Sequence, residues 1–271
     1  MRKSSVLSIL CGFLVFAQSA QADLIFSAPP RETEEKAKEI YGLFAEGLSA
    51  ALGKKVVYEY PNNFLDYGNR MRAGDFDIVF DAGHFVSWRV VHTNHEVVAK
   101  LPGSLFFYVV TLSEDIKSTE DLISRKVCTP APPNLGAVTL LSQFKNPVRQ
   151  PILVSIKGGF LGAAKSMKKG KCAAAVLRNN VYKNKISDED RSNFRIVYKS
   201  RPIPNQAITA GPNISASDKY KLAAALTANE GTEFADKLLS RFSKKSKHFE
   251  KSTGEEYTDL SLLLEGVVWG W

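Results

Sequence analysis

Polar and charged side chains follow the apolar runs of the N-terminal third, at the points where we expect strands to end. Guanidinium groups offer paired donors to anions, whereas hydroxyl, amide and imidazole groups add single hydrogen bonds. In open α/β sheets, solutes bind beyond the carboxyl ends of the strands, which makes these side chains candidate ligand contacts. They are Arg31, Glu32, Tyr60, Asn62, Asp81 and His84.

Four of these residues have a structural alternative to ligand binding. Arg31 is either an anion contact or a solvated charge in the first turn of a helix. Tyr60 is either a ligand contact or a core aromatic at a strand end. Asp81 follows a buried run, where an unpaired carboxylate is costly, so it either binds a cationic group of the solute or pairs with Arg31. His84 is either a ligand contact or a residue at a helix start.

The same rule selects loops in the middle of the chain. Arg178 ends an apolar run, which is a poor place for a charge without a function. Two adjacent glycines at positions 158 and 159 allow close approach of the backbone to a ligand. The candidate contacts of this half and of the segments that link the halves are Tyr108, Thr129, Asn134, Gly159, Arg178 and Asn205.

The spacing of reactive residues does not predict an enzyme. The sequence contains no G-x-S-x-G turn, no G-x-x-x-x-G-K phosphate loop and no metal-binding helix. Its four histidines do not stand at ligand spacing to a cysteine, and we expect His92 and His95 on a solvated turn. We therefore predict a binding protein that works without catalytic residues, a metal or a cofactor.

The N-terminus has the layout of a secretory signal peptide. A short positive start at Arg2 and Lys3 precedes an apolar run over residues 6–17, and Ala20-Gln21-Ala22 supplies the small-x-small pattern that signal peptidase reads. The apolar run is shorter than the roughly 20 residues of a membrane-spanning helix. We predict a signal peptide over residues 1–22, with cleavage after Ala22.

Charge and cysteine content narrow the choice of partners. The chain carries 36 Lys and Arg against 28 Asp and Glu, a formal net charge of +8. This charge favours anionic solutes, whereas its dispersal along the chain does not predict binding to nucleic acid. After cleavage Cys128 and Cys172 remain, and in an oxidising compartment they either form a disulfide, as we predict, or stay as buried thiols.

Strand-like and helix-like runs alternate twice along the chain. In the first unit, residues 24–27, 55–60 and 77–80 are expected strands that alternate with helices over 34–52 and 64–73. An extended segment near residues 96–111 leads to a second unit of the same kind. This order predicts an α/β fold with mostly parallel sheets flanked by helices. The expected strands of the second unit are residues 126–129, 152–156, 172–177 and 195–198.

Several segments of the chain carry a resemblance to a known family. The segments IKSTEDL (116–122) with RKV (125–127), GFLGAA (159–164), KGKCAAAV (169–176) and RPIPNQ (201–206) are similar to the junctions of type II periplasmic solute-binding proteins. The chain resembles the phosphate, phosphite and phosphonate branch of the substrate-binding proteins of ABC transporters. The resemblance covers nearly the whole chain after the signal peptide.

Two positions depart from the pattern of that branch. Cys172 stands where the family has an acidic residue. Phosphonate binders place a Ser/Thr cluster at a helix N-terminus that grips the anion, whereas this chain reads TPAPPN over residues 129–134. Proline removes both the hydroxyl and the backbone N–H donor, so this loop favours a rigid apolar wall over a phosphonate grip.

The resemblance implies two lobes joined by two crossover strands. Lobe 1 is then discontinuous, over residues 23–108 and 203–271, and lobe 2 spans residues 109–202, with Trp269 and Trp271 packed on a lobe surface. A small anionic, phosphate- or phosphonate-like solute would be captured in the periplasm by hinge closure and presented by a monomer to a permease. The alternative is a sensing or accessory module of the same fold that delivers its ligand to a signalling partner.

Overall fold

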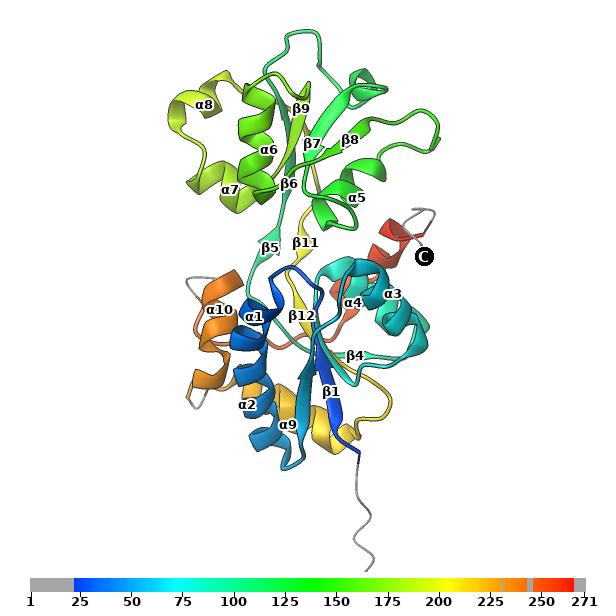
Figure 1. Cartoon of the computed structure of the whole chain (residues 1–271), viewed down its shortest axis with the longest axis vertical. Helices are drawn as coiled ribbons and strands as arrows, with labels where there is room; N and C mark the ends of the chain where they lie inside the picture. Colours follow the sequence, from blue (N-terminus) through cyan, green and yellow to red (C-terminus); the bar gives the residue numbers. More distant parts are fainter. Residues whose placement is uncertain (1–21, 231, 243–245, 266–271) are drawn as a thin grey trace, which may run out of the picture.

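The computed structural model describes residues 22–230, 232–242 and 246–265. Residues 1–21 of the predicted signal peptide lie outside the described residues, as do Trp269 and Trp271. Figure 1 shows two lobes, one above the other, joined by two thin connections. None of the helices described here is both long and apolar enough to cross a membrane.

Lobe 1 is built on a sheet with the strand order β2-β1-β3-β12-β4. β1, β2 and β3 pair in parallel, and β12 runs antiparallel to both β3 and β4. Every residue of β3 and β12 is buried, because helices cover both faces of the sheet centre (Figure 1). The strands are β1 (Leu24–Ser27), β2 (Val56–Glu59), β3 (Ile78–Asp81), β4 (Glu96–Lys100) and β12 (Ala207–Ala210).

Local capping signals set the ends of the lobe 1 helices. The side chains of Thr33, Asn63 and Ser215 accept hydrogen bonds from backbone N–H groups of the first turns. Gly53 and Gly74 end two helices in the left-handed conformation that glycine adopts without strain. The helices are α1 (Glu34–Ala37), the π-helical turn η1 (Lys38–Gly42), α2 (Leu43–Leu52), α3 (Phe64–Ala73), α4 (Gly83–His92), α9 (Ala216–Thr227), the 3₁₀ turn η3 (Glu233–Ala235) and α10 (Asp236–Phe242).

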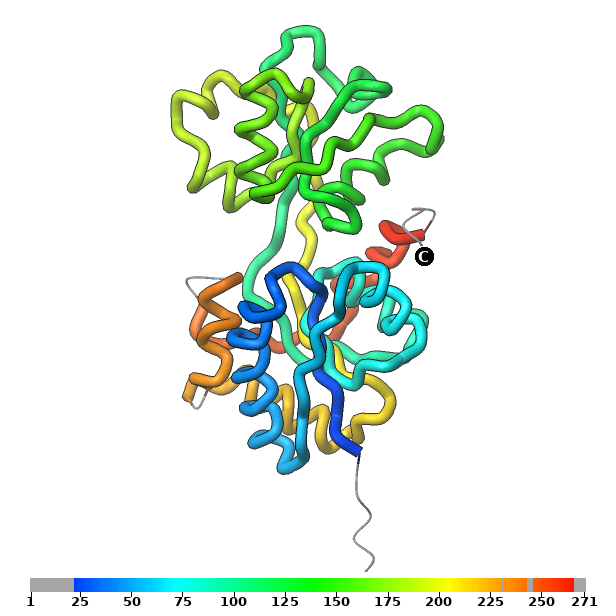
Figure 2. The backbone as a smooth tube through the Cα atoms, viewed as in Figure 1, coloured from blue at the N-terminus to red at the C-terminus, as the bar shows by residue number. Residues whose placement is uncertain are grey.

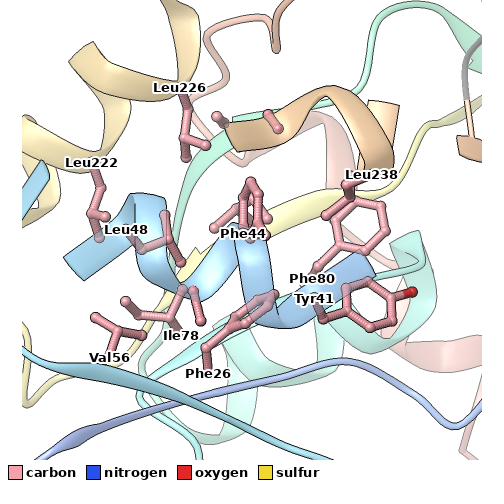
Figure 3. Packing of buried hydrophobic residues seen from close by; sticks show 14 of the residues in the cluster. Phe26, Tyr41, Phe44, Leu48, Val56, Ile78, Phe80, Leu222, Leu226 and Leu238 are labelled. Carbon is pink, nitrogen blue, oxygen red and sulfur yellow. The ribbon is translucent and has the colours of Figure 1, made fainter. Parts of the chain in front are cut away.

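An aromatic core fixes α2 on the lobe 1 sheet (Figure 3). Phe26 and Phe44 are fully buried, with ring centroids 5.2 Å apart. Phe80 from β3 contacts Phe242 of α10 edge-on, with centroids 5.0 Å apart. The hydroxyl of Tyr41 points away from the cluster in Figure 3. The core therefore anchors α10 above the end of β3, beside the interlobe region.

Lobe 2 repeats the arrangement with the order β10-β6-β9-β7-β8, in which β6 runs opposite to the other strands. A disulfide joins Cys128 of β7 to Cys172, with Cα atoms 5.6 Å apart, which confirms the predicted pairing. The strands are β6 (Phe107–Thr111), β7 (Lys126–Thr129), β8 (Ile152–Ser155), β9 (Ala174–Arg178) and β10 (Arg195–Lys199). The helices are η2 (Glu120–Leu122, 3₁₀), α5 (Leu135–Leu141), α6 (Gly159–Lys168), α7 (Asn179–Asn184) and α8 (Asp188–Asn193).

Two short antiparallel strands link the lobes. β5 (Ser104–Leu105) pairs with β11 (Ile203–Pro204), and the two segments run side by side between the lobes in Figure 2. After α10 the chain continues through the 3₁₀ turns η4 (Glu255–Tyr257) and η5 (Leu260–Leu263), and Tyr257 donates a hydrogen bond to the carbonyl of Asn205 (2.6 Å). The predicted two-lobed α/β fold with two crossovers is confirmed, and the residue limits of each lobe stay a prediction.

Some local expectations were wrong. His92 does end a helix at the surface, but His95 is buried rather than solvated, and its Nδ1 lies 3.1 Å from Thr209 Oγ1. The strand β12 and the helices α7 and α8 lack a counterpart in the sequence expectations.

Candidate ligand-binding site

A buried carboxylate organises the lobe 1 side of the interlobe region. Asp81, at the end of β3, is fully buried and accepts hydrogen bonds from Tyr67 Oη and from Arg31 Nη2 at 3.4 Å. Arg89 Nη2 lies 3.6 Å from Asp81 Oδ2, and the backbone N–H of Ala82 donates to Asp81 Oδ1 at 2.9 Å. Asp81 is thus committed to protein partners, and it holds Arg31 in place.

Arg31 keeps one donor nitrogen without a protein partner. Its Nη1 is buried and makes no hydrogen bond to the described residues, and the same holds for the hydroxyls of Tyr41 and Tyr58. The rings of these two tyrosines lie 5.2 Å apart, and burial raises the pKa of both hydroxyls. Tyr60 donates its hydroxyl to the carbonyl of Glu32 at 3.1 Å. Lobe 1 therefore offers a fixed guanidinium with spare donor capacity.

Arg178 is the corresponding cation of lobe 2. It follows the buried run of β9, and its Nε is buried without a hydrogen bond to the described residues. Burial lowers its pKa, and the nearby guanidiniums of Arg241 and Arg31 lower it further. Arg178 of lobe 2 thus feels the charge of two arginines of lobe 1.

Arg241 of α10 completes the group from the lobe 1 side. Its Nη2 lies 2.6 Å from Glu32 Oε1, so part of its charge is neutralised. The guanidiniums of Arg241 and Arg31 lie 5.0 and 5.7 Å from the ring centroid of Phe242. Phe242 therefore supports two cations at once through cation–π contacts.

A cavity of about 550 Å³ lies between α7 of lobe 2, α10 of lobe 1 and the linking strands. Among the described residues that line it, four are cations and none is a carboxylate. Such a cavity has the size of a typical small-molecule site and the charge of an anion site. The lining residues are Ser104, Leu105, Arg178, Asn179, Asn180, Lys183, Asn184, Lys185, Asn205, Arg241 and Phe242.

The proline-containing loop after β7 makes a direct contact between the lobes. His84 at the start of α4 is buried, and its Nε2 donates to the carbonyl of Pro133 at 2.8 Å. Burial lowers the pKa of His84 to about 3, so the ring stays neutral. The side chain of Asn134 caps α5 by accepting a hydrogen bond from the N–H of Gly136 (3.0 Å), so its oxygen is already engaged within the chain.

A family profile described as "ABC transporter, phosphonate, periplasmic substrate-binding protein" matches residues 26–257. The chain belongs to this family. Members are periplasmic solute-binding proteins that serve an ABC transporter, and the family is one of binding proteins rather than enzymes. No curated protein matches the chain by sequence.

Solved structures of similar fold agree with this assignment. PhnD1 of Prochlorococcus marinus in complex with methylphosphonate is 16% identical, with a TM-score of 0.64 over 89% of this chain and 96% of the other. A Xanthomonas citri protein bound to ATP is 12% identical, with a TM-score of 0.70 over 90% and 97%. A binding protein component of a phosphonate ABC transporter from Pseudomonas aeruginosa is 17% identical, with a TM-score of 0.59 over 88% and 83%. At these identities the likeness establishes the fold of this substrate-binding protein.

The sequence-based candidates of this binding protein fall into three groups. Arg178 and Asn205 line the cavity. The side-chain amide of Asn205 already donates to the carbonyl of Pro102 and accepts from the backbone N–H of Gln206. Arg31 and Glu32 lie beside the cavity and contact Phe242 and Arg241. The candidates outside the lining are Tyr60, Asn62, Asp81, His84, Tyr108, Thr129, Asn134 and Gly159.

The side chains outside the lining have other roles. The backbone N–H of Asn62 donates to Asp66, and Tyr108 is buried on β6 with its ring 4.8 Å from that of Tyr182. Thr129 Oγ1 is buried without a hydrogen bond to the described residues, and Gly159 adopts a positive φ of 64° at the start of α6. These residues do not line the cavity, and their part in ligand binding stays a prediction.

Several cavity residues were missed from the sequence. Lys183 and Lys185 belong to α7 and its C-terminal end, and Arg241 belongs to the C-terminal tail. Among the described residues, no group of three or more His, Cys, Asp or Glu side chains is arranged to hold a metal ion.

Proposed function

We propose that this substrate-binding protein captures a small anionic solute in the cavity between α7 and α10. The observation that carries the proposal is the lining itself, which joins cations from both lobes with no carboxylate among the described residues. Elsewhere in the described residues, several lysines pair with carboxylates, among them Lys36, Lys55 and Lys168. A cavity with unbalanced positive charge is stabilised by an anion.

The buried guanidinium of Arg178 gives the strongest support for an anion at this site. A guanidinium cannot lose its charge near neutral pH, so a buried Nε without an acceptor carries a desolvation cost. An oxyanion that accepts from Arg178 would remove this cost and would also relieve the repulsion from Arg241 and Arg31. Arg178 is therefore the residue that we expect to contact the ligand directly.

The position of the cavity supports a mechanism of hinge closure. Its lining residues come from α7 in lobe 2, from α10 in lobe 1 and from the linking segments, which contribute Leu105 and Asn205. A ligand that contacts both walls binds the closed arrangement more tightly than an open one and shifts the population toward it. A permease that recognises the closed form would then receive only loaded protein.

The ligand class follows from the charge and from the relatives. Methylphosphonate and ATP, which are bound in two of the related structures, both carry phosphorus oxyanions. The loop between Thr129 and Asn134 does not reproduce a hydroxyl-rich grip, since prolines occupy three of its positions. We therefore place the anion at Arg178, Arg241 and Arg31 rather than at the start of α5.

The remaining features of the proposal concern the context of the protein. We propose export through a signal peptide over residues 1–22, followed by function as a monomer with no cofactor. The family supports an ABC permease as the partner. A sensor domain as the receiver of the closed form is the alternative within the same fold.

A thermal-shift panel on the purified mature chain tests the proposal. The panel contains phosphate, phosphite, methylphosphonate, sulfate, carboxylates and amino acids. A ligand at 100 times its dissociation constant adds about 2.7 kcal/mol, which raises the melting temperature by roughly 5–11 °C for a chain of this size. We expect an oxyanion to produce this shift and Arg178→Ala to remove it.

A matched variant controls for the loss of an arginine. Arg125 is exposed on lobe 2, outside the cavity lining, and Arg125→Ala should keep the full ligand-induced shift. A panel in which oxyanions leave the melting temperature unchanged would contradict the proposal. So would an oxyanion that stabilises Arg178→Ala and the wild-type chain equally.

A further inference from the structure

Three of the four described cations that line the cavity are spread over α7 and the residues next to its two ends, and we call them the α7 row. Arg178 directly precedes α7, Lys183 lies in its last turn, and Lys185 directly follows it. At a helical rise of 1.5 Å per residue, the backbone distance from position 178 to position 185 is roughly 10 Å. Cations from both ends of this segment line the same cavity.

The charges along this row are not neutralised within the chain. Among the described residues, Arg178, Lys183 and Lys185 have no carboxylate oxygen within 4 Å, whereas lysines and arginines of neighbouring elements do. Lys168 pairs with Asp190, and Arg191 pairs with Asp188. Three uncompensated cations thus face one cavity, to which Arg241 adds a fourth, partly neutralised charge.

We infer that the solute carries two or more linked phosphoryl groups, one held by Arg178 and Arg241 and the next by Lys183 and Lys185. This inference rests on the proposed anion site and specifies its ligand. Guanidiniums grip a phosphoryl group with paired donors, and lysine ammonium groups act as point charges that suit the more exposed end. A diphosphate therefore matches the type of the cations and their number, since it carries more negative charge than a single phosphoryl group.

The volume of the cavity agrees with a ligand of this length. About 550 Å³ is within the range that holds drug-sized molecules and exceeds the needs of a lone phosphate or methylphosphonate. The lining also includes Asn180 and Asn184, whose side-chain amides hydrogen-bond to each other at 2.5 Å. The structure accommodates either an inorganic condensed phosphate or the diphosphate of a larger organic molecule.

Isothermal titration of the mature chain in magnesium-free buffer tests the inference. The probes are phosphate, methylphosphonate, pyrophosphate and adenosine diphosphate. We expect pyrophosphate to bind at least tenfold more tightly than phosphate. The double variant Lys183→Ala/Lys185→Ala should lose about tenfold in pyrophosphate affinity and less than threefold in phosphate affinity, since only the second phosphoryl group reaches these lysines.

The control is the double variant Lys169→Ala/Lys171→Ala. It removes two exposed lysines at the same spacing on the same lobe, outside the cavity lining, and should leave pyrophosphate affinity unchanged. Tighter binding of adenosine diphosphate than of pyrophosphate would assign the site to an organic diphosphate, and the reverse order to a condensed phosphate.

The outcomes separate this inference from the proposed function. Equal affinities for phosphate and pyrophosphate, or equal losses for both in Lys183→Ala/Lys185→Ala, would overturn the diphosphate inference and leave the anion site standing. A chain that binds none of the four probes would overturn both.

Discussion

Two buried histidines make the stability of this protein depend on pH. His84 and His95 are 1% and 3% exposed, and burial is the main reason why the pKa of each falls from 6.5 to about 3. The unfolded chain takes up a proton on each ring as the pH falls below 6.5, whereas the folded chain does not until about pH 3. Their contribution to stability is thus complete above pH 6.5 and is lost progressively between pH 6.5 and 3.

The magnitude follows from the size of the shift. pH 5 lies about 1.5 units below the pKa of a histidine in the unfolded chain. Protonation of each histidine therefore stabilises the unfolded state by about 2 kcal/mol relative to pH 7.5, or about 4 kcal/mol for both. Urea unfolding at the two pH values measures this difference. The double variant His84→Gln/His95→Gln should lose about 4 kcal/mol less than the wild-type chain over this interval.

The controls identify the groups responsible. Glutamine keeps an amide donor at position 84 for the carbonyl of Pro133, so the variant tests the titration rather than the contact. His92→Gln changes an exposed histidine at the end of α4 and serves as the matched variant. The reasoning is refuted if wild type and the double variant lose the same stability between pH 7.5 and 5.

Three further predictions concern stability. Asp81→Asn should destabilise the chain by about 3–5 kcal/mol in urea unfolding, because it leaves Arg89 buried without its carboxylate; a loss below 1 kcal/mol would contradict the ion-pair assignment. Replacing Cys128 and Cys172 by serine removes a crosslink between residues 44 positions apart and should lower the free energy of unfolding by about 4 kcal/mol, from the loss of chain entropy in the unfolded state. A reductant should lower the stability of the wild-type chain and leave that of the variant unchanged. Gly47→Ala places a Cβ 2.1 Å from the side chain of Phe234 and should destabilise the chain by about 1–3 kcal/mol. Gly42→Ala meets open space in the same helical segment and should stabilise the chain by about 0.5–1 kcal/mol. Stability changes of the same sign for both variants would contradict the packing of η3 on α2.

Elements with local end signals could be predicted from the sequence. The helix over residues 64–73 has its predicted limits because Asn63 caps its first turn and Gly74 ends it in the left-handed conformation. α4 was not delimited, because Ala82 precedes it without a side-chain cap. Apolar strands such as β7 could also be predicted, because polar residues follow them in the sequence.

Elements that depend on distant partners could not be predicted. β12 has only four residues, and its place between β3 and β4 depends on pairing with strands more than 100 positions earlier. α7 has no buried residue, so its sequence lacks the apolar period that indicates a helix. Its cationic side chains were missed with it.

The candidate site was only partly accessible for the same reason. Arg178 could be selected because a charge at the end of a buried run is locally unusual. Arg241 reaches the site only because Phe242 packs on Phe80, a tertiary contact between residues 162 positions apart. Asp81 was weighed as a ligand contact or as a partner of Arg31, and the structure places it in the second role.

The most direct test of the central claim is the position of a bound oxyanion. Crystals of the mature chain grown with arsenate, a phosphate analogue that scatters anomalously, would locate it without reference to the protein coordinates. We expect an anomalous peak between the lobes, with arsenate oxygens about 2.7–3.2 Å from the guanidinium nitrogens of Arg178 and Arg241. A peak at the loop between Thr129 and Asn134, with Arg178 left unoccupied, would contradict the account.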